Sequence, residues 1–410
     1  MKKTIITTAI AAALVSPFVM AETTDQKIAQ LEQQVASLSS LVADATTEKV
    51  RVNGFASGAF GISDNDIGYK GYTTDGSYHQ DSLFGLQGTF QPTENFEATL
   101  QVVAKGEFDW DPQVTWAYLG YTFDNDVKVR IGKLGLPLFM LSEYIDVGYA
   151  MPWATSPEEV YGRVPITSFT GIDASYEIEL DDSYINLQGF TGNENMAGAS
   201  AAGGSGKVED IVGAVMSWSD DYWTVRGSYT VATVKDVSFP DITVDPQGPL
   251  PGYTGSSLPT LDKESGSYAS FGVRYEDETW LVMAEATQTR VDGYFSDSDS
   301  GYVTVGYHIN QVMPYVSLAR LKTVDNDERD ASKYALGSDE WYQYMAADKG
   351  LTYERVAYSL GARWDIQPGL AMKFDTTYTT NFGDTAGGMA GNTTDEDSAM
   401  VYTIKLDATF

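Results

Sequence analysis

Charged side chains occur in two distinct settings in this sequence. Acids and one base lie within a single apolar stretch at about residues 134–167, and six further bases lie in segments where polar and apolar residues alternate. Acids that face bases across a narrow aqueous space would set a transverse field that orders polar solutes. The candidates are Glu143, Asp146, Glu158, Glu159 and Arg163 in the stretch, and Lys128, Arg130, Arg226, Arg274, Arg363 and Lys373 outside it.

Each of these bases also has a purely structural interpretation. An ion pair with a neighbouring acid such as Asp173, Glu177 or Asp375 would stiffen the fold without acting on any solute. The sequence supports the two interpretations equally for any single base, so both stay open.

Side chains for covalent and metal chemistry are scarce. The 410 residues include no cysteine and two histidines, His79 and His308. Without thiols there is no disulfide framework, thiolate metal site or cysteine nucleophile. Two isolated histidines offer little for imidazole metal sites or a serine–histidine–aspartate triad. We therefore predict no catalytic residue, no metal and no cofactor, and we expect no enzyme.

The composition indicates a fold and excludes one class of partner. The formal net charge is −31, so a nucleic acid would be repelled. The 39 Gly, 26 Tyr, 17 Phe and 8 Trp, with 20% charged residues, are typical of a large antiparallel barrel.

The elements that position the charged residues are strands. From residue 50 onward the hydrophobic pattern has a period of two, in segments close to the 9–11 residues of a tilted membrane-crossing strand. Sixteen segments are predicted: 50–61, 80–91, 95–105, 113–123, 126–133, 168–180, 183–191, 209–218, 222–234, 266–276, 279–290, 301–309, 312–322, 353–364, 369–380 and 398–410.

The connections between these segments alternate in length. Turns such as Asp124-Asn125 and Asp181-Asp182 join one end, while the opposite connections are longer and rich in Gly, Asp, Ser and Pro. Short turns at one end and long loops at the other are typical of a bacterial outer-membrane barrel. The fold class we predict is all-β, a sixteen-stranded antiparallel transmembrane barrel.

The two faces of each segment agree with lipid outside and water inside. Trp223, Val225 and Tyr229 alternate with polar residues that include Arg226. By this alternation the six bases point into the lumen. Aromatic residues gather beside the short turns and would form an interfacial girdle: Phe123, Trp218, Tyr222, Trp280 and Trp364.

The stretch at about 134–167 is too apolar for a loop in water. Leu136, Phe139, Trp153 and Tyr161 must pack against something, and the inner wall of the barrel is nearest. The alternative is an external lid packed on neighbouring loops.

The first 49 residues differ from the rest. Residues 1–21 resemble a secretory signal, with Lys2 and Lys3 before a short apolar run. Residues 22–49 are predicted to be a periplasmic helix, which either forms a coiled coil or stays a lone amphipathic helix. Its apolar heptad positions are Ile28, Leu31, Val35, Leu38 and Val42. Residues 50–410 form the predicted barrel.

The last segment ends in alternating apolar residues and a terminal Phe410, which resembles the signal read by the barrel-assembly machinery of Gram-negative bacteria. The whole chain after the signal resembles the trimeric sixteen-stranded porins. The stretch Asp146 to Tyr161 is similar to their third loop, and the helix before the barrel resembles that of the DcaP-like porins.

This resemblance implies a passive diffusion channel for small hydrophilic solutes, with a third loop that folds inward and constricts the pore. The DcaP-like porins further imply a preference for anions. The expected location is the Gram-negative outer membrane, and the expected partners are lipid, lipopolysaccharide, the assembly machinery and two copies of the same chain. The alternative function is a structural barrel or adhesin that acts through acidic external loops and the helical segment.

Overall fold

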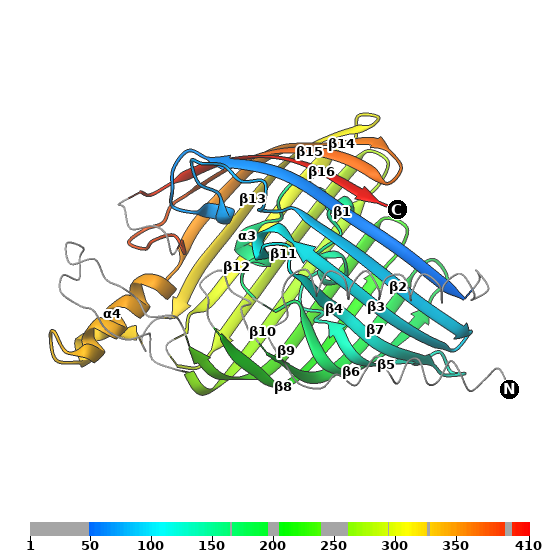
Figure 1. The fold of residues 1–410 in the computed structure, drawn as a ribbon, viewed down its shortest axis with the longest axis horizontal. Coiled ribbons are helices and arrows are strands. Elements are labelled where there is room, and N and C mark those ends of the chain that lie inside the picture. Colours follow the sequence, from blue (N-terminus) through cyan, green and yellow to red (C-terminus); the bar gives the residue numbers. More distant parts are fainter. Residues whose placement is uncertain are drawn as a thin grey trace, which may run out of the picture. The chain divides into compact units, whose positions relative to one another are not determined.

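The computed structural model shows a closed antiparallel β-barrel of sixteen strands (Figure 1). It describes residues 49–164, 166–195, 205–238, 261–293, 295–325, 329–389 and 396–410. The predicted signal and all but the last residue of the predicted helix lie outside these ranges.

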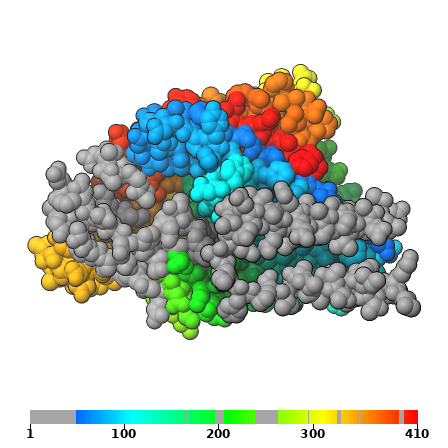
Figure 2. All heavy atoms as spheres, viewed as in Figure 1, coloured from blue at the N-terminus to red at the C-terminus, as the bar shows by residue number. Residues whose placement is uncertain are grey.

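Every strand pairs with its neighbours in the sequence, and the pairing of β1 with β16 closes the barrel. The strands are β1 (Val50–Ser63), β2 (Leu83–Thr93), β3 (Phe96–Lys105), β4 (Pro112–Thr122), β5 (Lys128–Gly135), β6 (Ser168–Glu179), β7 (Tyr184–Asn195), β8 (Ser205–Ser219), β9 (Trp223–Ser238), β10 (Leu261–Glu276), β11 (Trp280–Val291), β12 (Asp297–Tyr307), β13 (Val312–Asp325), β14 (Glu354–Gln367), β15 (Leu370–Thr380) and β16 (Ala399–Thr409). Figure 2 shows the first strands in blue beside the last ones in orange and red.

Short helices lie in the long connections. They are η1 (Tyr69–Gly71), η2 (Gly106–Phe108), η3 (Ser142–Tyr144), η4 (Gly148–Ala150), α3 (Glu158–Tyr161), η6 (Ala331–Lys333) and α4 (Asp339–Leu351). Within the described ranges, none of the helices has both the length and the apolar character to cross a membrane.

All sixteen predicted strands are confirmed. Three begin four or five residues earlier than the sequence predicted, at Ser205, Leu261 and Asp297. Their additional residues are mostly polar, so they lack the apolar alternation that marks a membrane-crossing strand. Ladder pairing nevertheless continues there, for example between Lys263 and Lys235.

The short turns form as their composition predicts. The Asp220 carboxylate accepts hydrogen bonds from the backbone N–H groups of Tyr222 and Trp223, at 2.8 and 2.7 Å. The Asp277 carboxylate accepts from the N–H groups of Thr279 and Trp280 in the same way, at 2.7 and 2.6 Å. An aspartate that caps its own turn replaces the lost ladder bonds.

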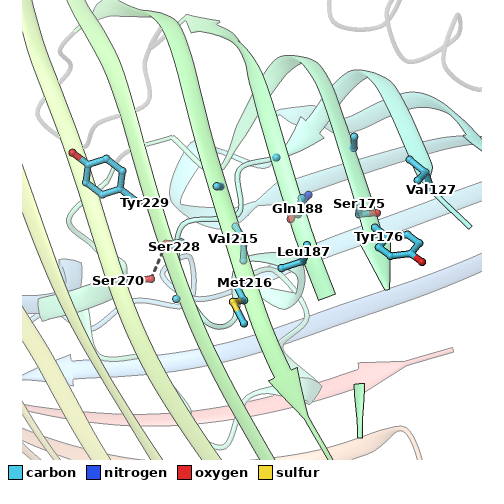
Figure 3. Close-up of a pocket in the computed structure, with 14 residues that line it drawn as sticks. Val127, Ser175, Tyr176, Leu187, Gln188, Val215, Met216, Ser228, Tyr229 and Ser270 are labelled. Atoms are coloured by element: carbon cyan, nitrogen blue, oxygen red, sulfur yellow. Dashed lines mark hydrogen bonds between the residues drawn. The ribbon is translucent and has the colours of Figure 1, made fainter. Parts of the chain in front are cut away.

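The outer wall is apolar and carries one shallow hollow. Small residues of β6 to β9 leave this hollow, with Tyr176 and Tyr229 at its two sides (Figure 3). These tyrosines are exposed, as are Phe123 and Trp280 beside the short turns. An apolar outer face on a closed barrel is what lipid requires, because backbone groups within lipid need internal partners. The barrel is therefore of the outer-membrane type.

The C-terminal residue is part of the barrel closure. The backbone of Phe410 bonds to that of Gly54 in β1 in both directions, at 2.6 and 2.9 Å. Its ring covers Gly54 so closely that a Cβ there would lie 2.3 Å from a ring carbon. A side chain at position 54 therefore fits only if the Phe410 ring moves.

We predict that Gly54→Val weakens barrel closure. A side chain at position 54 must displace the Phe410 ring, and because that ring is largely exposed the cost is at the low end of the roughly 1–3 kcal/mol of core overpacking. Gly58 is the matched control, because it lies in the same strand and a Cβ there has no atom within 4 Å. Denaturant midpoints of the refolded proteins should fall for Gly54→Val and stay unchanged for Gly58→Val. Equal midpoints for the two variants would contradict the role of this contact.

Candidate functional site: the third loop inside the barrel

The third loop, residues 136–167, lies against the inner wall of the barrel. Its apolar side chains are buried, including Leu138, Phe139, Trp153 and Val160. They form one cluster with inward-facing residues of the wall, such as Met283. In Figure 1 the α3 segment of this loop is drawn beside the strands β11 and β12, which it contacts. The external-lid alternative does not agree with these contacts.

Wall side chains of β9 and β10 hold the first part of the loop by its backbone carbonyls. Arg226 donates to the carbonyls of Pro137 and Leu138, at 2.7 and 3.3 Å. The hydroxyls of Ser228 and Ser270 lie 2.7 and 2.8 Å from the same Leu138 carbonyl, and 2.8 Å from each other (Figure 3). The loop backbone is thus satisfied by wall donors instead of water.

A second group of wall bases, on β14 and β15, holds the middle of the loop. Arg363 donates to the carbonyls of Tyr149 and Met151, at 2.7 and 3.0 Å, and its guanidinium lies 4.8 Å from the centre of the Tyr149 ring. Lys373 donates to the Gly148 carbonyl at 2.6 Å. Charge-assisted bonds of this kind are stronger than neutral ones, so the loop is anchored at both sides of the lumen.

The last part of the loop is anchored by an acid that the sequence did not suggest. Glu285 of β11 accepts from the Met140 backbone N–H and from the Tyr161 hydroxyl, both at 2.9 Å. The Trp153 indole donates to Thr304 of β12 at 2.9 Å. These bonds satisfy polar groups that packing would otherwise leave unpaired.

Two of the loop acids pair with bases outside the predicted set. Asp146 lies 2.8 Å from Lys105 of β3. Glu159 lies 2.6 Å from Arg355 of β14, and it also accepts from the Tyr69 hydroxyl at 3.1 Å. Strand alternation places Lys105 and Arg355 in the lumen, but the sequence does not show which acid each would meet.

Three long loops meet at Arg355. Besides Glu159 of the third loop, Arg355 donates at 2.9 Å to the Gly387 carbonyl of the eighth loop, residues 381–398. Its guanidinium also lies 5.5 Å from the centre of the Tyr69 ring in the first loop, residues 64–82. Arg355 is 5% exposed, so this junction is shielded from water.

Adjacent carboxyls in α3 have opposite environments. Burial raises the pKa of Glu158 above its usual range, since attraction to Arg355 only partly offsets it. Burial also acts on Glu159, but there the charge and hydrogen bond of Arg355 outweigh it and lower the pKa. The folded loop therefore stabilises the charged form of Glu159 and destabilises the charged form of Glu158.

The six predicted wall bases differ in their partners. Five of them pair with acids of the wall itself: Lys128 with Glu97 at 2.7 Å, Arg130 with Asp173 at 3.0 Å, Arg274 with Glu276, Arg363 with Asp365 at 2.8 Å and Lys373 with Asp407 at 2.7 Å. Among the described residues no carboxylate pairs with Arg226. Five of the six bases therefore have the ion-pair partner that the structural interpretation requires.

Three charged residues of the loop, Glu143, Glu158 and Arg163, have no ion pair in the described part of the chain. Glu143 is exposed and lies within electrostatic reach of Arg130 and Arg226. Arg163 is half-buried, with its guanidinium 4.3 Å from the centre of the Tyr353 ring. Of the predicted loop acids, Glu143 faces open solvent most directly.

We predict that Arg355→Met loosens the third loop. Breaking a buried ion pair costs about 3–5 kcal/mol, because it leaves the partner charge unpaired. The chain contains no cysteine, so a single cysteine at buried Thr155 reports local opening. Thiol labelling of Thr155→Cys should be about tenfold faster or more in the Arg355→Met background.

Lys322→Met is the control for this experiment. Lys322 lies on the neighbouring strand and pairs with Glu354 at 3.1 Å, but it is exposed. Its loss should leave the labelling rate unchanged. Labelling that stays slow in a folded Arg355→Met variant would show that the junction does not hold the loop.

We predict opposite pH dependences for Glu158→Gln and Glu159→Gln. Glu158 has a raised folded pKa, so its charge destabilises the fold as pH rises above the unfolded value near 4.5. Glu158→Gln should therefore gain stability over the wild type with rising pH. Glu159 has a lowered folded pKa, so its stabilisation is present above that value and is lost as pH falls through the folded pKa. Glu159→Gln should therefore become less stable relative to the wild type as the pH rises. Denaturant midpoints between pH 4 and 8 test both, and parallel curves would refute the assignment.

The fold is similar to that of solved outer-membrane porins and channels. No protein-family model matches the sequence, and no curated protein matches it. The trimer form of OmpT, an outer membrane protein of Vibrio cholerae, has a TM-score of 0.54 and 12% identity, over 88% of this chain and 100% of that chain. An anion-selective porin from Comamonas acidovorans has 0.52 and 12%, over 88% and 99%. The outer membrane channel DcaP of Acinetobacter baumannii has 0.52 and 12%, over 88% and 97%.

Proposed function

We propose that this chain is an outer-membrane porin through which small hydrophilic solutes diffuse passively. The observation that carries the proposal is the third loop, which lies inside the barrel and is anchored to opposite walls through Asp146 on β3 and through its carbonyls on β9, β10, β14 and β15. A loop that is held across the lumen narrows the lumen but need not close it. Pore-lining charges and hydrogen-bonding groups then act on solutes at close range.

The constriction in this proposal lies beside Glu143. Glu143 and Tyr144 are the exposed side chains of the η3 segment, whereas most of the loop is buried against the wall. Arg130 and Arg226 face Glu143 from the strands. The transverse field of the constriction therefore rests on these three side chains more than on the full predicted set.

The proposed assembly is a homotrimer. One similar structure is described as a trimer form, and the predicted heptads from Ile28 to Val42 would join three chains in the periplasm.

We also propose that residues 1–21 are a signal peptide, that Phe410 is read by the assembly machinery, and that acidic external loops contact lipopolysaccharide through divalent cations.

The alternative of a structural barrel or adhesin has less support. It rests on acidic external residues such as Asp339 and Glu340, which lie in the first turn of α4. It does not explain why a wall of paired charges and a loop of buried aromatic residues occupy the lumen.

We predict that the refolded protein conducts in a planar lipid bilayer. An open trimer should insert as events that close in three equal steps, because each chain encloses its own pore. Protein unfolded by heat is the control and should give no events. If protein with the mobility of a folded barrel gives no conductance, the porin function is wrong and the structural alternative is favoured.

A further inference from the structure

The hollow on the outer wall of the barrel has a volume of about 730 Å³ and lies over β6 to β9 (Figure 3). Its floor is a row of small residues, because Ala174, Gly189 and Ala214 lie directly opposite one another on β6, β7 and β8. Side chains of at most one carbon let the surface of the wall recede there. The exposed rings of Tyr176 and Tyr229 lie at the two sides of the hollow.

The hollow lies on the side of the membrane that faces the short turns. Gly189 is seven residues beyond Asp182, which is roughly 16 Å along the membrane normal at 3.3 Å per residue and a tilt of about 45°. Leu187 and Met216 are one step closer to the turns, lie opposite each other and are exposed. Because the hydrocarbon core is about 30 Å thick, a lipid chain anchored at the short turns reaches the floor of the hollow near the middle of the membrane.

The rim of the membrane below the hollow is acidic. The three short turns on these strands, residues 123–127, 180–183 and 220–222, contain six aspartates and no base. Lys128, which follows the first turn, pairs with Glu97 at 2.7 Å. Such a rim repels a lipid headgroup with a net negative charge and attracts an ammonium group.

Aromatic side chains beside the same turns suit the polar part of a lipid. Tyr222 and Trp223 are exposed at the start of β9, below the hollow. Tyrosine hydroxyls and indole N–H groups at a membrane interface combine an apolar ring with a hydrogen-bond donor. They offer donors to the phosphate and ester oxygens of a headgroup whose acyl chain lies in the hollow.

We propose that the hollow binds an acyl chain of a phospholipid from the periplasmic leaflet, and that the acidic turns favour a headgroup with an amine, as in phosphatidylethanolamine. The apolar floor matches the acyl chain, and the charge of the rim matches the ammonium group. This inference needs only the lipid-facing wall of the barrel, so it is independent of whether the barrel conducts. A second copy of the chain is the competing occupant, since small residues also let two protein surfaces approach closely.

Native mass spectrometry of the refolded, delipidated protein tests the site. Phosphatidylethanolamine and phosphatidylglycerol with identical acyl chains are added in separate titrations. The first lipid bound per chain should have a Kd about fivefold lower for phosphatidylethanolamine, the effect expected for about one unit charge near a membrane surface. Tighter binding of phosphatidylglycerol would overturn the headgroup assignment.

A variant that fills the hollow tests where the lipid binds. In Gly189→Leu/Gly227→Leu the nearest atoms to the new Cβ positions are 4.0 and 3.8 Å away, so the wall tolerates both side chains. This variant should bind phosphatidylethanolamine about tenfold more weakly or less. Gly58→Leu is the matched control, because it adds the same side chain at an exposed glycine of β1 with no atom within 4 Å, outside the hollow. Its Kd should equal that of the wild type.

The acidic rim is tested separately with Asp181→Asn/Asp182→Asn. This variant should keep its binding of phospholipid but lose most of the preference for phosphatidylethanolamine. Equal lipid binding by the filled variant and the wild type, both with the mobility of a folded barrel, would overturn the acyl-chain site. Chain association that the filled variant abolishes, with lipid binding unchanged, would assign the hollow to a second copy of the chain instead.

Discussion

Lipid offers no partner to a backbone N–H or C=O group, and the arrangement of this chain follows from that constraint. Sixteen strands satisfy one another only if the last pairs with the first, so the register of β1 with β16 closes the hydrogen-bond ladder. The backbone bonds between Phe410 and Gly54 belong to this closure. They matter because lipid offers these backbone groups no other hydrogen-bond partner. The apolar residues must face outward, which leaves the polar half of every strand for the interior.

The same constraint acts a second time on the third loop. A buried loop must find donors for its carbonyls, and the inward-facing polar residues are available for this. Arg226, Arg363 and Lys373 therefore bind carbonyls of the loop. A cation used in this way still needs its charge balanced in a partly dry environment. Asp365 and Asp407 supply this balance for two of them, so anchoring the loop and neutralising the wall are linked.

The sequence predicted the strands well because their signal is local. Period-two alternation and turn composition depend on residues within about ten positions of each other, and lipid outside with water inside leaves one choice of face. The strand ends were less predictable, since the added residues of the strands that begin at Ser205 and Leu261 are mostly polar and lack the alternation. The inward face of each predicted base also follows from this local pattern.

The partners of the charged residues were not predictable in the same way. Asp146 meets Lys105, and Glu159 meets Arg355, across 41 and 196 positions of the sequence. Which acid meets which base depends on the path of a loop without regular repeats. Glu285 was missed because an acid on a strand otherwise rich in apolar and hydroxyl residues has no motif to mark it. Its role follows only once the loop backbone is seen to need an acceptor.

Net charge and the charge of the passage are separate quantities in such a fold. The excess of acid includes external residues such as Asp297 and Asp299, which meet Arg290 at 3.7 and 2.6 Å at the long-loop end. Charges in water are screened within about 8–10 Å at physiological salt, so the surface acids act little on a solute that has reached the loop. Beside the loop the nearest charged side chains set the local potential, and most of the wall bases there are paired with acids. The formal charge of −31 therefore does not by itself set the charge that a solute meets beside the loop.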